Sequence, residues 1–355
     1  MLPVCIASIS PFAGKDVVAV GMAEKLCADG KRVGYFKPYG PLAARRGDNV
    51  VDEDAEFFKE ILDLSETLDT LCPVVIDDAT VSRMLQGEAA STKERVLEAY
   101  RTAADQKDVT LVMGMGNMTC GETFGFPMSE LVREVDARVV VVDRYRWPME
   151  TLDGLLRMKA ELGDRLAGVI FNNVLASRRA QIEQQVAPFL RQRSIPVFGL
   201  VMEDTLLHAV PVSQLVEALG ARVLCCEEAL DELVEHLSIG AMNAESALRF
   251  FRRTPNKAVI TGGDRADIHM AALETSTRCL ILTGDLHPNE RILARAEDLG
   301  VPVLLAGQES AAAAEACERA FEHRSLHSEK KIRRIKSLME QHLDWKLLAE
   351  KLHLS

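Results

Sequence analysis

The chain has 355 residues, enough for two or three domains of about 150 residues each. Hydrophobic residues make up 48% and charged residues 27%, which is typical of a globular protein with a sizeable core. The formal net charge of −11 argues against nucleic acid or an anionic membrane as the main partner.

No apolar run approaches the ~18 residues of a membrane span, and no positively charged leader precedes a long apolar segment. We therefore expect a cytoplasmic protein with no membrane partner. The eight cysteines are scattered, without CxxC or His-spaced pairing, and this favours buried, reduced thiols.

The first motif lies at residues 4–16, VCIASISPFAGKD, where an apolar run changes into a loop of small residues. The pattern predicts a strand, a phosphate-binding loop and a helix over residues 16–28, and a second strand at 33–36 completes a βαβ unit. The backbone N–H groups of such a loop and the positive end of the helix attract phosphate oxygens, and Lys15 can reach the β and γ phosphates. The candidate ligand-binding residues here are Ser10, Ala13, Gly14, Lys15 and Asp16. An ordinary strand-to-helix turn is the alternative.

The loop departs from the usual phosphate-loop pattern at two positions. A Gly-Lys pair is usually followed by Ser or Thr, whose hydroxyl binds magnesium, whereas Asp16 follows it here. Ser8 stands where an opening glycine is expected. Asp16 can offer a carboxylate oxygen to Mg²⁺, but it also places a negative charge beside a triphosphate.

Apolar runs alternate with amphipathic stretches along residues 1–225. The runs predict strands at residues 4–7, 33–36, 74–76, 109–113, 139–142, 166–171 and 197–200, with helices including 93–105, 149–161 and 178–193. Strands that are apolar throughout indicate burial on both faces, which is typical of a parallel sheet flanked by helices. Right-handed crossovers then give a doubly wound α/β domain.

Residues 226–307 are predicted to form a smaller, Rossmann-like α/β domain. We expect helices at 230–237, 243–253, 266–274 and 289–299, and strands at 258–261, 278–283 and 301–305. Gly263 and Arg265 follow the first strand, where Arg265 can bind a phosphate or carboxylate with a helix N-terminus behind it. In the alternative, Asp264 caps the helix and Arg265 forms a local or subunit-interface salt bridge. The tail at 308–355 reads as helical, with a basic run at 330–336 on a solvated face.

Several segments carry a family pattern. They are residues 8–15, GYFKP at 34–38, DEDAEFF at 52–58 and GVIFNNV at 168–174, followed by NKAVITGGDRADI at 256–268 and CLILTGDLHP at 279–288. The first four resemble the dethiobiotin-synthetase-like P-loop domain at the N-terminus of long phosphotransacetylases, and the last two resemble the DRTGG domain that follows it there. The resemblance implies a P-loop domain at 1–225, a DRTGG domain at 226–307 and a helical tail at 308–355. The acetyl-transfer domain of those longer enzymes has no counterpart in these residues, so we do not expect acetyl transfer from this chain alone.

The resemblance also assigns roles at the strand ends, where ligands of parallel sheets bind. Lys37 matches a lysine that would face a substrate carboxylate or phosphate; the alternative is a solvent-exposed lysine beside Pro38. Asp54 matches a magnesium ligand, with Asp52 as a nearby substitute. The alternative is that these acids only cap the helix that runs to residue 62.

Two further strand ends are informative. Asn172 and Asn173 match the position where an asparagine of the family recognises the adenine edge, and a capped turn is the alternative. Relatives end the 109–113 strand with a glutamate that helps to hold magnesium, but here the residue is Met113, whose thioether is a poor ligand for a hard cation. Efficient ATP hydrolysis is therefore not expected.

The leading hypothesis is a regulatory or assembly protein that binds ATP or ADP, with Asp16 and Asp54 as candidate Mg²⁺ ligands and little or no ATPase activity. We expect a homo-oligomer formed through the DRTGG domain, with a metabolic enzyme as a candidate partner. The alternative is an ATP-dependent carboxylate-activating ligase of the dethiobiotin synthetase or cobyrinic acid a,c-diamide synthase type. A structural subunit with a vestigial loop is a third hypothesis.

Overall fold

The computed structural model describes residues 1–10, 12–47, 49–87, 92–322, 326 and 328–354. The chain divides into two compact units. The first unit contains Met1–Glu203 and Ile332–Ser355, and the second contains Asp204–Lys331. The domain boundaries predicted from the sequence, at residues 225 and 307, stay predictions. Among the described residues, no helix has both the length and the apolar composition to cross a membrane.

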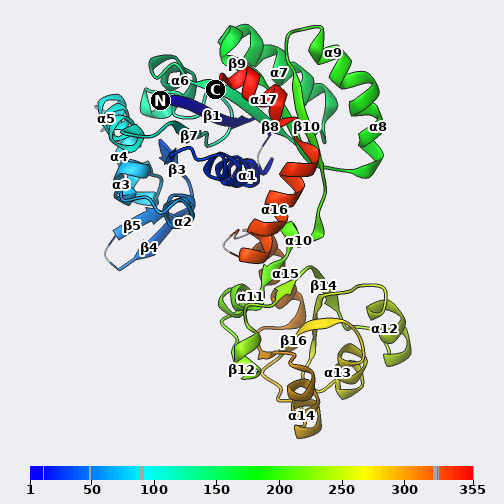
Figure 1. Ribbon diagram of the computed structural model, residues 1–355. Helices are drawn as coiled ribbons and strands as arrows, with labels where there is room; N and C mark the ends of the chain where they lie inside the picture. The colour runs from blue at the N-terminus through cyan, green and yellow to red at the C-terminus, as the bar shows by residue number, and fades with distance from the viewer. Residues whose placement is uncertain (11, 48, 88–91, 323–325, 327, 355) are drawn as a thin grey trace. The chain divides into compact units, whose positions relative to one another are not determined.

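The first unit is built on a six-stranded sheet with the order β10-β9-β8-β1-β7-β2 (Figure 1). Its strands are β1 (Leu2–Ser8), β2 (Val33–Phe36), β7 (Val109–Met113), β8 (Arg138–Asp143), β9 (Leu166–Val174) and β10 (Val197–Met202). Every neighbouring pair runs parallel. Most of these strand residues are buried, as expected for a sheet covered on both faces, so the predicted parallel sheet is confirmed.

Helices from both the N-terminal and the C-terminal part of the chain pack on this sheet. Helix α1 (Lys15–Ala28) contacts β1, β2 and β7, and α17 (Trp345–Leu352) contacts β9 and β10. The other helices of this unit up to residue 203 are α2 (Glu53–Ile61), α3 (Leu68–Leu71), α4 (Asp78–Leu85), α5 (Thr92–Ala104), η1 (Glu122–Phe124), α6 (Met128–Glu134), α7 (Pro148–Leu162), η2 (Gly163–Arg165), η3 (Ala176–Arg178), α8 (Arg179–Gln181), η4 (Ile182–Val186) and α9 (Ala187–Arg191). The helical tail predicted after residue 308 is present as α15 (Ser310–Glu322), α16 (Glu329–His342) and α17.

Two details of the first unit differ from the prediction. The strand predicted at 74–76 is short and lies outside the main sheet, because β6 (Val74–Val75) pairs with β3 (Tyr39–Gly40) instead. An antiparallel hairpin of β4 (Ala43–Arg46) and β5 (Asn49–Asp52) was not predicted. Its residues are mostly polar and exposed, so they lack the apolar alternation that marks a strand in a sequence.

The second unit has a five-stranded mixed sheet with the order β12-β17-β16-β15-β14 (Figure 1). Its strands are β12 (Arg222–Cys225), β14 (His236–Ile239), β15 (Lys257–Gly262), β16 (Thr277–Thr283) and β17 (Val303–Leu305), of which only β12 is antiparallel to its neighbour. Successive strand residues enter opposite cores: Ile260 packs with α11 (Val212–Leu219) and α15, and Val259 packs with α12 (Ala244–Phe251), α13 (Ala266–Leu273) and α14 (Glu290–Leu299).

The helix predicted at 230–237 is wrong. Leu233–Val234 form β13, which pairs with β11 (Val210–Pro211), and His236–Ile239 form the edge strand β14. The Leu and Glu content of this stretch favours a helix locally, but pairing with β15 overrides a propensity of only a few tenths of a kcal/mol per residue.

Candidate phosphate-binding site

The parallel strands of the first unit bring their carboxyl ends to one edge of the sheet. Residues that follow β1, β2, β7, β8 and β9 therefore meet there, although they are far apart in the sequence. Nearly all the predicted ligand residues of this unit lie at this edge, and several of them contact one another.

The phosphate loop joins the end of β1 to the start of α1. Gly14 adopts a left-handed conformation, with φ 78°, and precedes α1 without a side-chain cap. The ammonium of Lys15 donates a hydrogen bond to Ser8 Oγ at 3.0 Å, back along the loop. Burial lowers the pKa of Lys15. The uncapped N-terminus of a 14-residue helix and a lysine beside it can both attract an anion.

Two buried side chains from neighbouring strands hold the loop. Asp143 at the end of β8 accepts a hydrogen bond from Ser10 Oγ at 3.0 Å, and also accepts from Tyr145 N and Thr151 Oγ1. Asn172 at the end of β9 donates to Ala13 O at 3.0 Å. Asp143 was not predicted from the sequence, although a single acid at the end of the apolar run RVVVVD was a visible signal.

Asp16 lies in the first turn of α1 and is half-buried. Burial, together with the negative charge of Asp54, raises the pKa of its carboxyl. The two predicted metal ligands, Asp16 and Asp54, thus lie close enough for their charges to interact. Their charged forms disfavour each other unless a cation lies near them.

Lys37 lies directly after β2 and is buried in a cluster of acids. Its ammonium contacts Asp52 Oδ1 at 2.8 Å, Asp52 Oδ2 at 3.0 Å and Asp54 Oδ2 at 2.6 Å. The side chains of Lys37 and Asp52 are 4% and 0% exposed, and that of Asp54 is 32% exposed. Burial alone would lower the pKa of Lys37, but the carboxylates of Asp54 and Asp52 outweigh burial and raise it. Lys37 is therefore neither an exposed lysine nor a cation without a partner.

Asp52 also caps α2, as the alternative interpretation of this acidic cluster expected. Its Oδ1 accepts from Ala55 N at 3.1 Å, and its Oδ2 accepts from Leu42 N at 3.2 Å. One carboxylate thus fixes the start of a helix and neutralises Lys37.

The residues fit a magnesium ion only in part. Asp16 and Asp54 offer hard oxygen ligands, but Met113 is buried at the end of β7 and offers none. In the part of the chain that the structure describes, no group of three or more His, Cys, Asp or Glu side chains is arranged to hold a metal. Mg²⁺ often binds proteins through one or two carboxylates together with phosphate oxygens, so these two acids suit an ion that arrives with a nucleotide. That role stays a prediction.

The predicted ligand residues of the second unit have local partners. Arg265 donates to Asp267 through Nε at 3.0 Å and to Met242 O through Nη2 at 2.9 Å. A Cβ on Gly263 would clash with the carbonyl oxygen of Leu286, so this glycine allows two turns to pack together. Helix α13 has no side-chain cap, so the cap by Asp264 that the alternative interpretation included is absent. The geometry agrees with the local salt bridge, with Asp267 as its acid.

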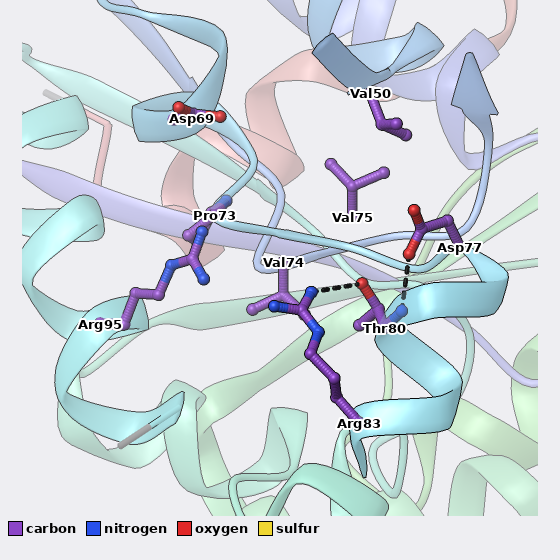
Figure 2. A pocket seen from close by; sticks show the side chains of 9 residues that line it. All are labelled: Val50, Asp69, Pro73, Val74, Val75, Asp77, Thr80, Arg83 and Arg95. Atoms are coloured by element: carbon purple, nitrogen blue, oxygen red, sulfur yellow. Dashed lines mark hydrogen bonds between the residues drawn. The ribbon is translucent and has the colours of Figure 1, made fainter. Parts of the chain in front are cut away.

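A separate cavity of about 180 Å³ lies among residues 50–95 of the first unit (Figure 2). Its lining consists of Val50, Asp69, Pro73, Val74, Val75, Asp77, Thr80, Arg83 and Arg95. Figure 2 shows Arg83 bonded to Thr80, whose backbone N–H in turn bonds to Asp77. None of the predicted ligand residues lines this cavity.

Comparison with known proteins places the two units in families. A family model described as an AAA domain matches residues 3–237, about two thirds of the chain. The chain belongs to this AAA domain family. A second model, described as a DRTGG domain, matches residues 214–320. The combination of an AAA domain with a DRTGG domain confirms the resemblance stated from the sequence.

Curated relatives that match nearly the whole of this chain are phosphate acetyltransferases. That of Synechocystis sp. is 24% identical over 94% of this chain and 49% of its own length, and that of Pseudomonas aeruginosa is 25% identical over 95% and 50%. The ATP-dependent dethiobiotin synthetase BioD of Bacillus subtilis is 23% identical over 56% of this chain and 88% of its own length. This AAA and DRTGG chain thus spans about half the length of the phosphate acetyltransferases that it matches, and resembles their N-terminal half.

Proposed function

We propose that the chain binds an adenine nucleotide, ATP or ADP, at the carboxyl ends of the parallel strands in its first unit. In this proposal it acts as a regulatory or assembly protein with little or no ATP hydrolysis. The observation that carries this proposal is the phosphate loop itself. Lys15 lies beside the uncapped N-terminus of α1, and the loop is held by Asp143 and Asn172. The likeness to an enzyme described as ATP-dependent favours ATP over other phosphate compounds.

The charges at the site support a role for magnesium in binding. Two lysines, Lys15 and Lys37, stand with four acids, Asp16, Asp52, Asp54 and Asp143, which gives a formal charge of −2 if all six are ionised. A triphosphate alone gains little from such a site. One Mg²⁺ ion cancels this negative charge, so nucleotide affinity should depend strongly on the metal.

Weak hydrolysis follows from the residues that replace the usual metal ligands. Asp16 stands where a hydroxyl normally binds magnesium, and Met113 stands where the resemblance expects a glutamate. Without the usual hydroxyl and glutamate, the γ phosphate lacks part of the electrostatic stabilisation that phosphoryl transfer needs. Saturable ATP binding, with phosphate release no faster than in buffer, is the expected pair of results.

A regulatory role also requires that nucleotide binding affects other parts of the chain, and α16 is a candidate for such an effect. Met339 on this helix packs so closely on α1 that a Cβ on Gly21 would clash with it. The first residues of the same helix belong to the second unit. A change in the position of α1 can therefore bear on α16.

The second candidate function is an ATP-dependent carboxylate-activating ligase. Its support is the alignment with 88% of the length of a dethiobiotin synthetase and the position of Lys37 at a strand end. Phosphate release that requires a carboxylate substrate and disappears in Lys15→Ala would favour this function over the first.

The assembly part of the proposal concerns a homo-oligomer formed through the DRTGG domain and contact with a metabolic enzyme. Native mass spectrometry of freshly purified protein reports both the number of subunits and any retained nucleotide. A monomer at micromolar concentration would contradict the oligomer. A bound mass other than ATP or ADP would contradict the choice of nucleotide.

A further inference from the structure

The side-chain amide of Asn172 is bonded to the backbone of the phosphate loop. Its Nδ2 donates to Ala13 O at 3.0 Å and lies 3.4 Å from Gly14 O, across 159 and 158 positions of the sequence. Asn172 is 3% exposed and Ala13 is fully buried. A Cβ on Gly14 would clash with Nδ2, so the missing side chain of Gly14 makes room for the amide.

In this arrangement the amide nitrogen donates to two carbonyl oxygens of the loop. An asparagine side chain has two N–H hydrogens to donate, and two carbonyl oxygens face them here. An amide that read an adenine edge would need one of these hydrogens for the base. Without the amide, the buried carbonyl of Ala13 would lose this partner, which costs more than the hydrogen bond itself contributes.

We propose that Asn172 is a positioning residue for the phosphate loop. It fixes the peptide groups of Ala13 and Gly14, so the N–H groups that follow them at the start of α1 are oriented before a ligand arrives. Its contribution is then to the phosphate chain of the ligand, whatever base is attached. The affinity for free tripolyphosphate should therefore depend on Asn172 as strongly as the affinity for ATP does. The affinity part of this inference rests on the proposed function, whereas the ordering of the loop does not.

Two variants and one matched control separate positioning from recognition of the base. Asn172→Ala removes the amide, and Asn172→Leu removes it while keeping the side-chain volume, in case the smaller residue unfolds the protein. The control is Thr110→Val in β7, a buried residue of the same sheet whose hydroxyl has no hydrogen-bond partner within the described residues. Thermal unfolding of each variant checks its fold.

The first measurement is hydrogen exchange of the ligand-free protein. We expect the amides of residues 13–15 to exchange faster in both Asn172 variants than in wild type and Thr110→Val. The second measurement is titration with magnesium ATP and with magnesium tripolyphosphate. The Asn172 variants should lose about fivefold to tenfold in affinity for both ligands, the size of one hydrogen bond.

The outcomes are distinct. A loss of affinity confined to ATP would show that Asn172 contacts the base, and it would overturn the inference. Unchanged hydrogen exchange in the loop would also overturn it. If wild type binds neither ligand, the proposed function fails, and the exchange measurement alone then decides whether Asn172 positions the loop.

Discussion

Lys37 and Asp52 form a buried ion pair in which the ammonium contacts both carboxylate oxygens, at 2.8 and 3.0 Å. Asp52 is at the same time the cap of α2. The pair therefore joins the end of β2 to the start of α2, next to the phosphate loop. Its first consequence concerns stability rather than binding.

Lys37→Met should destabilise the ligand-free protein by about 3 kcal/mol, because it leaves the carboxylate of Asp52 buried without its cation. Asp54→Asn should cost no more than about 1 kcal/mol, since Asp54 is partly exposed and solvent screens its charge. Adding Asp52→Asn to Lys37→Met should recover part of the loss. Guanidinium denaturation of the four proteins measures these differences. Equal midpoints for Lys37→Met and wild type would show that the pair contributes nothing.

Asp16→Thr should strengthen the binding of magnesium ATP, because it removes a carboxylate from beside the triphosphate. Two unit charges about 4 Å apart at an effective dielectric of about 20 repel by about 4 kcal/mol, a scale that water and magnesium reduce. A quarter of that scale is about fivefold in affinity. Weaker binding by Asp16→Thr would instead identify Asp16 as a working metal ligand or cap.

Hydrolysis should remain poor in Asp16→Thr, since Met113 still offers no oxygen to the metal. Only Asp16→Thr combined with Met113→Glu should raise phosphate release above that of wild type. Met113→Glu alone is the control for that comparison.

Lys257 in the second unit should make stability depend on pH. It is fully buried, donates to Thr275 Oγ1 and Ser276 O, and burial lowers its pKa to about 8. The unfolded chain keeps a lysine pKa of about 10.4. Between these values the unfolded chain binds a proton that the folded chain lacks, so the free energy of unfolding rises with pH, by up to about 3 kcal/mol. In Lys257→Met this rise should be smaller. Urea unfolding at about pH 7.5 and 10 measures it, and parallel changes in the two proteins would contradict the buried charge.

Gly263 should be required for packing rather than for binding a ligand. Gly263→Ala should destabilise the second unit by at least about 2 kcal/mol, since the new methyl group meets the carbonyl of Leu286. Gly307→Ala, at a glycine with open space around it, is the matched control and should change stability by less than about 0.5 kcal/mol. Similar melting temperatures for the two variants would contradict this role.

Much of the fold follows from local sequence pattern. Apolar runs marked all six strands of the main sheet, and the loop of small residues before Gly14 marked the turn into α1. The segment at 230–237 could not be predicted in this way, since its edge strand is set by pairing with β15. The hairpin of β4 and β5 is mostly exposed and lacks a periodic apolar face.

The site was predictable to a smaller extent. The loop residues and Lys37 stand at recognisable positions, but their partners come from other strands. Ser10 meets Asp143 across 133 positions, and Asn172 reaches Ala13 across 159. Such contacts depend on strand order and on how far each strand extends, which no local pattern records. The double role of Asp52 is of the same kind, because it needs both the cap of α2 and the end of β2.

We propose above that the phosphate loop binds a nucleotide through its phosphates. Isothermal titration of wild type and Lys15→Ala with ATP and ADP, each with and without Mg²⁺, tests it most directly. We expect saturable binding to wild type in the presence of Mg²⁺, and at least about a tenfold loss in Lys15→Ala, the scale of a charge-assisted hydrogen bond. No binding to wild type at millimolar nucleotide, or equal affinity for the two proteins, would contradict the account.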